Sequence, residues 1–208
     1  MFNVSALFSS ALFATAAQAS FHMGGCPAFE TMGADFDVNR YTGHWFEVVK
    51  DKYTFFELGA GCVQADYGLN EDGSLSVKNT AHRFFFGWSS IEGTGVESNV
   101  TGPGTFNVNL HGEPSADKAG NYNVISTDYD TYTVVYSCKE KFGGLVSSDY
   151  FWILAREQTL SDEALIDIIK VVEEKLPGYN FFANHSMGRQ GWTCPYDNMP
   201  TTEANFTQ

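Results

Sequence analysis

Short apolar runs separated by turn residues dominate residues 43–156 of the chain. Several runs alternate apolar and polar residues, as in Leu75-Ser76-Val77, which is typical of a β-strand with one buried face. Asn70-Glu71-Asp72-Gly73, Gly102-Pro103-Gly104 and Asp128-Tyr129-Asp130 are turn sequences between such runs. The pattern predicts eight strands, at Trp45–Val49, Cys62–Leu69, Ser74–Asn79, Trp88–Val96, Thr105–Leu110, Asn121–Ser126, Thr131–Cys138 and Tyr150–Arg156.

Eight evenly spaced strands predict an all-β, antiparallel fold, either a barrel or a sandwich. A closed barrel also removes the exposed sheet edges. No internal repeat, low-complexity tract or linker divides the chain, so we expect a single domain in residues 20–208, with its core at about 26–195 and a short C-terminal tail.

Only one segment has a helical pattern. Ser161 is a suitable N-cap, and Asp162 and Glu163 follow in the first turn, where the helix dipole favours negative charge. Pro177-Gly178 ends the segment. The apolar stripe of this helix, which must pack on the outside of the sheet, consists of Leu165, Ile169, Val172 and Leu176.

The first 19 residues have the composition of a secretory signal peptide. They contain no charged side chain and end in Ala17-Gln18-Ala19, which predicts cleavage before Ser20. A membrane anchor is the alternative, but Asn3 and the serines that follow leave too short an apolar run to span a bilayer. The sequence therefore predicts a secreted, extracellular protein.

The four cysteines are Cys26, Cys62, Cys138 and Cys194. An even number in a secreted chain indicates two disulfides, and spacing alone allows three pairings. Zinc is the competing interpretation, but single cysteines scattered along the chain do not have the spacing of a structural zinc site. We expect no metal and no cofactor other than a bound ligand.

Charge and the remaining motifs exclude several functions. The net charge of −13 disfavours nucleic acid, which attracts basic proteins. The histidines are scattered, and no catalytic grouping is visible, so we do not expect an enzyme and name no catalytic residue. Asn99, Asn184 and Asn205 begin glycosylation sequons, each of which is a candidate in a secreted protein.

Three segments in order resemble the signatures of the lipocalin family. Gly43-His44-Trp45 resembles the first, Thr127-Asp128-Tyr129 with the strand that follows resembles the second, and Phe151-Trp152-Ile153-Leu154-Ala155-Arg156 resembles the third. The run from Cys62 to Tyr67 and the pair Cys194-Pro195 are similar to the apolipoprotein D branch of that family. The resemblance covers nearly all of the chain after residue 26.

This resemblance implies an eight-stranded up-and-down β-barrel with one α-helix packed outside. It also implies disulfides Cys26–Cys138 and Cys62–Cys194, and a closed base where Arg156 lies across the indole of Trp45. The implied structural signature residues are Gly43, Trp45, Thr127, Asp128, Tyr129 and Arg156. The implied function is to carry a small hydrophobic ligand of the fatty acid, steroid, retinoid or bilin type. A ligand of the bilin type would be a pigment.

Strand alternation assigns the side chains that face into such a barrel. A solid core is the alternative to a ligand cavity, and the small residues Ala65 and Ser89, together with the resemblance, favour a cavity. The expected ligand-binding residues are Val63, Ala65, Tyr67, Leu75, Val77, Asn79, Ser89, Ile91, Phe106, Val108, Leu110, Thr133, Val135, Trp152 and Leu154.

Phenylalanines are concentrated in two connections expected at the mouth of the barrel, and they are Phe55, Phe56, Phe84, Phe85 and Phe86. Turn tips usually carry small polar residues, so this aromatic content requires a reason. Either these side chains fold inward and cap the pocket, or they form an apolar patch that docks on a lipoprotein, a membrane or a partner subunit. The second alternative also gives the competing function, an interaction protein or a subunit of a pigment complex.

Overall fold

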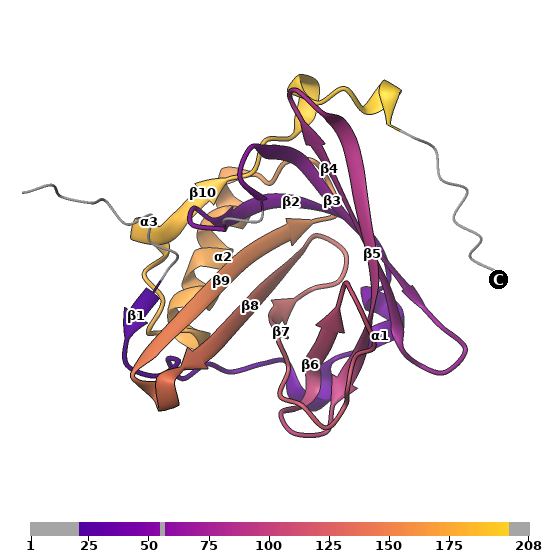
Figure 1. Ribbon diagram of the computed structural model, residues 1–208. Helices are drawn as coiled ribbons and strands as arrows, with labels where there is room; N and C mark the ends of the chain where they lie inside the picture. The colour runs from indigo at the N-terminus through magenta and orange to yellow at the C-terminus, as the bar shows by residue number, and fades with distance from the viewer. Residues whose placement is uncertain (1–20, 55–56, 200–208) are drawn as a thin grey trace, which may run out of the picture.

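The computed structural model describes residues 21–54 and 57–199, and they form a closed antiparallel barrel (Figure 1). Each strand from β2 to β9 pairs with the next along the chain, and β9 pairs back with β2 to close the barrel. The barrel strands are β2 (Gly43–Asp51), β3 (Ala60–Leu69), β4 (Leu75–Arg83), β5 (Gly87–Ser98), β6 (Gly102–Asn109), β7 (Tyr122–Thr127), β8 (Tyr132–Lys141) and β9 (Val146–Ala155). The prediction of an eight-stranded up-and-down barrel is confirmed.

The structure adds several short elements to the predicted set. β1 (Phe21–Met23) pairs with β9, and β10 (His185–Met187) pairs with β2 on the other side. The prediction of a single helix was incomplete, because α1 (Val38–Tyr41) and α3 (Phe181–Asn184) each form one turn, too short for a visible period. Single 3₁₀ turns occur at Gly33–Asp35, Phe142–Gly144, Gly191–Thr193 and Tyr196–Asn198.

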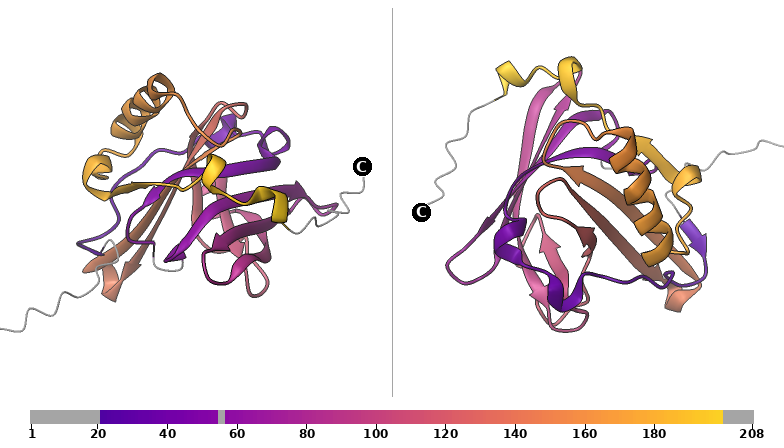
Figure 2. Two further views of the ribbon diagram at one scale, coloured as in Figure 1. Left: turned by 90° about the horizontal axis from the view of Figure 1, so that it is seen from above. Right: turned by 180° about the vertical axis from the view of Figure 1, so that it is seen from behind.

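The predicted helix is α2 (Asp162–Lys175), and it lies against the outside of the barrel (Figure 2). Ser161 caps it, since its hydroxyl accepts a hydrogen bond from the backbone N–H of Ala164. Ile168, Val172 and Leu176 are buried against the outward faces of β2, β8 and β9, in a core with Val49, Ile153 and other apolar side chains. Because this core lies outside the barrel, the packing of α2 does not fill the interior of the barrel.

A second core closes one end of the barrel. Tyr41 of α1 and Trp45 of β2 are fully buried there, with Phe36 packed against them. The guanidinium carbon of Arg156 lies 3.6 Å from the centre of the Trp45 ring. Arg156 also donates hydrogen bonds to the carbonyl oxygens of residues 40, 41, 42, 44 and 129. The closed base that the resemblance implies is therefore present.

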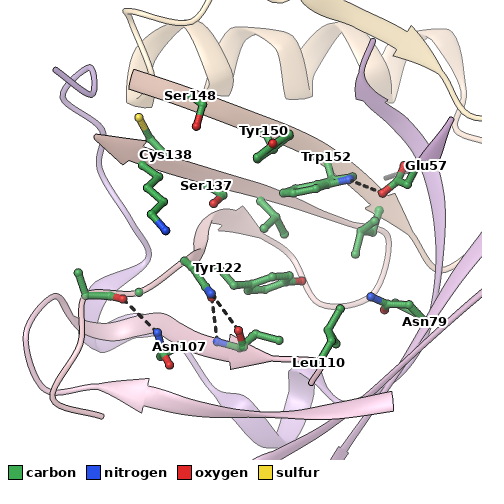
Figure 3. A pocket seen from close by; sticks show the side chains of 18 of the residues that line it. Glu57, Asn79, Asn107, Leu110, Tyr122, Ser137, Cys138, Ser148, Tyr150 and Trp152 are labelled. Atoms are coloured by element: carbon green, nitrogen blue, oxygen red, sulfur yellow. Dashed lines mark hydrogen bonds between the residues drawn. The ribbon is translucent and has the colours of Figure 1, made fainter. Parts of the chain in front are cut away.

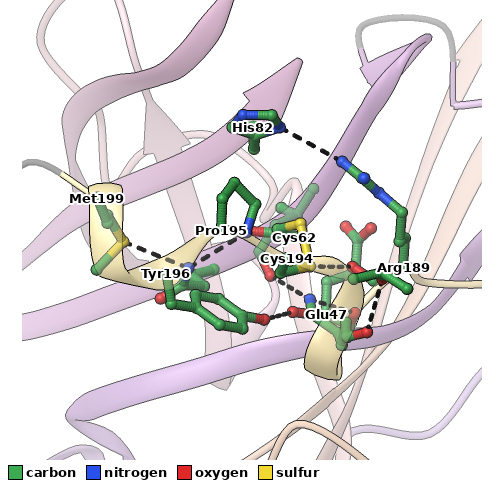
Figure 4. Close-up of a disulfide and its surroundings, with 12 residues drawn as sticks. Glu47, Cys62, His82, Arg189, Cys194, Pro195, Tyr196 and Met199 are labelled. Carbon is green, nitrogen blue, oxygen red and sulfur yellow. Dashed lines mark hydrogen bonds between the residues drawn. A yellow bond between two sulfur atoms is a disulfide. The ribbon is translucent and has the colours of Figure 1, made fainter. Parts of the chain in front are cut away.

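Two disulfides, Cys26–Cys138 and Cys62–Cys194, fasten the two ends of the described chain to the barrel. The first attaches the segment before α1 to β8. The second attaches the C-terminal segment to β3, where Tyr196 and Met199 lie beside it (Figure 4). Both are the pairings that the family resemblance implies.

Candidate functional site

The barrel contains a cavity of about 890 Å³ that is open at the end opposite α1. Apolar and aromatic side chains from β3, β6, β8 and β9 form most of its wall, and a few polar side chains interrupt them (Figure 3). A concave, mainly apolar space with a few polar groups is the usual form of a small-molecule site.

Most of the side chains expected to face the ligand line this cavity. Trp152 and Tyr150 lie along one wall and Leu110 lies on the opposite side (Figure 3). The predicted residues that line the cavity are Val63, Ala65, Tyr67, Asn79, Val108, Leu110, Val135, Trp152 and Leu154.

The other six predicted residues do not line the cavity. Four of them point inward but lie too close to the base, where they are buried in the closed end, and they are Leu75, Val77, Phe106 and Thr133. Ser89 lies near the tip of the β4–β5 hairpin, where it is exposed and accepts a hydrogen bond from Arg83. Ile91, two residues further along β5, is only partly buried. Alternation gives the face of a side chain correctly but not its height in the barrel.

Sequence reasoning missed several lining residues. Tyr150 is two residues before Trp152, and Ser137 is two residues after Val135, so each faces the cavity like its predicted neighbour. Extending the alternation along these strands finds both. Tyr122 lies on β7, for which no inward residue was assigned. The remaining lining side chains come from β2, β6, β8 and the connections between strands, and include Glu47, Glu57, Asn107, Lys118, Asn121, Lys139 and Lys141.

Glu47 shares the inward face with Trp45, two residues earlier, but no inward residue was assigned on this strand, and a β-bulge after Glu47 adds Lys50 to the same face. The pairing of β2 with β9 shifts between Glu47 and Val49, so that Glu47 opposes Leu154 and Lys50 opposes Trp152. Glu47 and Lys50 are three residues apart, yet the extra residue in the bulge turns Lys50 toward the inside as well. Strict alternation would have placed them on opposite faces.

These two side chains form a charge cluster with Glu57 of the β2–β3 connection. The Lys50 ammonium lies 2.9 Å from Glu57 Oε2 and 3.5 Å from Glu47 Oε1. Burial, followed by the nearby charge of Glu57, raises the pKa of Glu47 well above its ordinary value, although Lys50 opposes this. Burial alone would lower the pKa of Lys50, but the two carboxyl groups together raise it, so Lys50 keeps its charge. The indole N–H of Trp152 donates to Glu57 Oε1 at 3.3 Å.

Hydroxyl groups meet where the cavity adjoins the closed base. The Tyr41 and Tyr122 hydroxyl oxygens are 2.6 Å apart, and the Tyr122 hydroxyl donates to that of Tyr67 at 3.0 Å. Thr133 Oγ1 donates to the Tyr41 hydroxyl at 3.3 Å. Burial raises the pKa of Tyr41 to about 12 and raises the pKa of Tyr67 further. These hydroxyls therefore stay protonated at physiological pH.

Within residues 21–54 and 57–199, no cluster of three or more His, Cys, Asp or Glu side chains has the arrangement of a metal site. The same part of the chain has no helix long and apolar enough to cross a bilayer.

Comparison with known proteins agrees with this architecture. Residues 42–181 match the Lipocalin / cytosolic fatty-acid binding protein family. The chain is 36% identical to apolipoprotein D of Rattus norvegicus over 154 residues, which are 74% of this chain and 78% of that protein. It is 38% identical to apolipoprotein D of Cavia porcellus over 155 residues, with the same two coverages.

A solved structure shows the same fold at lower sequence identity. Lobster apocrustacyanin A1 superposes with a TM-score of 0.71 at 20% identity, covering 85% of this chain and 94% of that chain. With the family match and the relatives above, this chain belongs to the Lipocalin / cytosolic fatty-acid binding protein family. The predicted similarity to the apolipoprotein D branch is confirmed.

Proposed function

We propose that this protein is a secreted carrier that holds a small hydrophobic molecule inside its barrel. The observation that carries the proposal is the cavity itself, whose wall is largely apolar and whose few polar groups can orient a ligand. The description of the family as fatty-acid binding supports a lipid-like ligand. Fatty acids, steroids, retinoids and bilins all belong to this chemical range, and a bilin would give visible absorbance.

The proposal of secretion rests on the leader sequence and the disulfides. The predicted signal peptide, Met1–Ala19, lies outside the described residues. Two disulfides are typical of proteins from oxidising compartments. Of the sequons, Asn99 is exposed and suits glycosylation, Asn184 is only partly exposed, and Asn205 lies outside the described residues.

Trp152→Ala should weaken binding of an apolar fluorescent probe by roughly ten- to hundredfold. The side chain lines the cavity, and truncating a large aromatic side chain in a desolvated pocket typically costs about 1–3 kcal/mol. Fluorescence titration of the folded variant measures the change. Trp192→Ala is a matched control, because Trp192 is 96% exposed and does not line the cavity. Equal affinities for wild type and Trp152→Ala would show that the ligand does not occupy this cavity.

A second proposed role is docking on a lipid or lipoprotein surface through the β4–β5 turn. Phe84, Phe85 and Phe86 are 78%, 86% and 83% exposed, and none of them lines the cavity. Capping of the pocket by these three side chains is therefore not what the structure shows. Phe55 and Phe56, which belong to the same prediction, lie outside the described residues. Exposed consecutive aromatic side chains are rare on proteins that have no apolar partner.

Changing Phe84, Phe85 and Phe86 to serine should abolish flotation with liposomes and leave affinity for the soluble probe unchanged. Docking driven by apolar contact should also persist at high salt, because ionic screening does not weaken it. Flotation with zwitterionic liposomes and probe titration measure the two properties. Replacing the exposed Val100, in the turn at the other end of β5, with serine is a control that should preserve flotation. If the triple variant floats like wild type, the turn is not the docking surface.

A further inference from the structure

The hydrogen-bonded hydroxyls at the inner end of the cavity have a fixed direction. Each hydroxyl has one hydrogen to donate. Since Tyr122 donates its hydrogen to Tyr67, it cannot also donate to Tyr41, and Tyr41 must be the donor in their 2.6 Å contact. Thr133 in turn donates to Tyr41. The chain therefore runs from Thr133 through Tyr41 and Tyr122 to Tyr67.

The last hydroxyl in this chain, that of Tyr67, keeps an unused hydrogen. Within residues 21–54 and 57–199, its one hydrogen-bond partner is the Tyr122 hydroxyl at 3.0 Å, and Tyr67 is the acceptor in that contact. Tyr67 is only 5% exposed and lines the cavity. A buried donor without an acceptor is unfavourable, so an acceptor that enters the cavity would be bound here.

Asn79 provides a second polar group on the same wall. In the β3–β4 ladder Tyr67 pairs with Val77, and Ala65 pairs with Asn79, so Tyr67 and Asn79 are diagonal neighbours on the inward face. The Asn79 side chain lines the cavity and has no hydrogen-bond partner in the described part of the chain. The ring of Tyr122 extends toward the Asn79 side of the cavity (Figure 3).

The charges around the cavity favour a neutral acceptor over an anion. Lys50, the basic side chain closest to this wall by strand position, is already engaged by Glu57 at 2.9 Å and Glu47 at 3.5 Å. Arg156 lies beneath Trp45 and binds backbone carbonyls. A carboxylate next to Tyr67 would be desolvated without a cation of its own, which is costly, whereas a ketone, ester or amide oxygen is not charged. An ammonium group would offer hydrogens rather than the lone pair that Tyr67 requires.

We propose that Tyr67 and Asn79 form a carbonyl-binding subsite, in which the Tyr67 hydroxyl donates to a neutral carbonyl oxygen of an otherwise apolar ligand. This inference rests on the proposed carrier function and specifies the class of ligand and its orientation. The carbonyl end lies at the closed end of the barrel, and the apolar remainder extends past Trp152 toward the mouth.

The test uses the fluorescent ketone Prodan and an analogue in which a methylene group replaces its carbonyl. Hydrogen bonding to the ketone oxygen shifts Prodan emission to longer wavelength, so one titration reports both affinity and the hydrogen bond. Tyr67→Phe removes only the hydroxyl. Tyr132→Phe is the matched control, because the Tyr132 hydroxyl contacts Ser126 and does not line the cavity.

In Tyr67→Phe, Prodan should bind roughly fivefold more weakly, the loss expected for one neutral hydrogen bond, and its bound emission should shift to shorter wavelength. The methylene analogue should bind wild type and variant equally. Asn79→Leu replaces the amide with an apolar side chain of similar size. It should weaken the binding of Prodan and leave the binding of the methylene analogue unchanged. The control variant should behave like wild type.

Unchanged Prodan affinity and emission in Tyr67→Phe would overturn the subsite. Equal losses for Prodan and its analogue would also overturn it, because they would report altered shape rather than a lost hydrogen bond. If neither probe binds the wild-type protein, the carrier function fails, and the subsite fails with it.

Discussion

Arg156→Ala should lower the free energy of unfolding by about 3–5 kcal/mol. The guanidinium lies 3.6 Å from the Trp45 ring centre and donates to five backbone carbonyls at the closed end of the barrel. Removing it takes the guanidinium hydrogen bonds away from these carbonyls and uncovers the indole face. Urea denaturation, followed by intrinsic fluorescence, measures the change.

Two further substitutions separate charge from geometry. Arg156→Lys keeps the charge but cannot reach several carbonyls at once, so it should recover only part of the loss. Arg40→Ala removes an exposed arginine from the same end, whose ion pair with Asp130 is solvated and is worth at most about 1 kcal/mol. A loss for Arg156→Ala no larger than that for Arg40→Ala would refute the structural role of Arg156.

Replacing Cys26 and Cys138 together with alanine should cost about 5 kcal/mol of stability in the chain-entropy description. The disulfide joins residues 112 positions apart, so its loss gives the unfolded chain much more freedom. The Cys62 and Cys194 pair, with a separation of 132, should have a similar effect. Urea denaturation of each double variant measures the loss.

Peptide mapping without reduction is the direct check on this connectivity. It should yield one linked pair with Cys26 and Cys138 and another with Cys62 and Cys194. A free thiol in the native protein, or a crossed pair, would contradict the pairing.

The sequence predicted the strands well, because turn residues mark both ends of each one. Asn70 to Gly73 and Asp128 to Asp130 fall between observed strands, whereas Gly102 to Gly104 begin β6, and the predicted boundaries differ from the observed ones by only a few residues at most ends. The capping residue Ser161 also located the start of α2 correctly. These are local signals, so a single sequence contains them. The disulfide pairing, by contrast, came from the family resemblance and not from spacing.

The shape of the cavity could be predicted only in part. Alternation identifies the inward face, but the height of a side chain depends on strand stagger, which placed Phe106 in the closed base and Ser89 near a hairpin tip. The bulge beside Val48 moved Lys50 onto the face of Glu47 without a signal in the residue pattern. Glu57 reaches the cavity from a connection, where alternation says nothing.

Native mass spectrometry of the secreted protein tests the carrier function most directly. The wild-type protein should retain a bound small molecule, seen as added mass that is released when the protein unfolds. Ala65→Trp should lose this mass while remaining folded, because Ala65 lines the cavity and the larger side chain fills the space. If the wild-type protein shows only the mass of its own chain, both as secreted and after incubation with a lipid extract, the barrel does not carry a hydrophobic ligand.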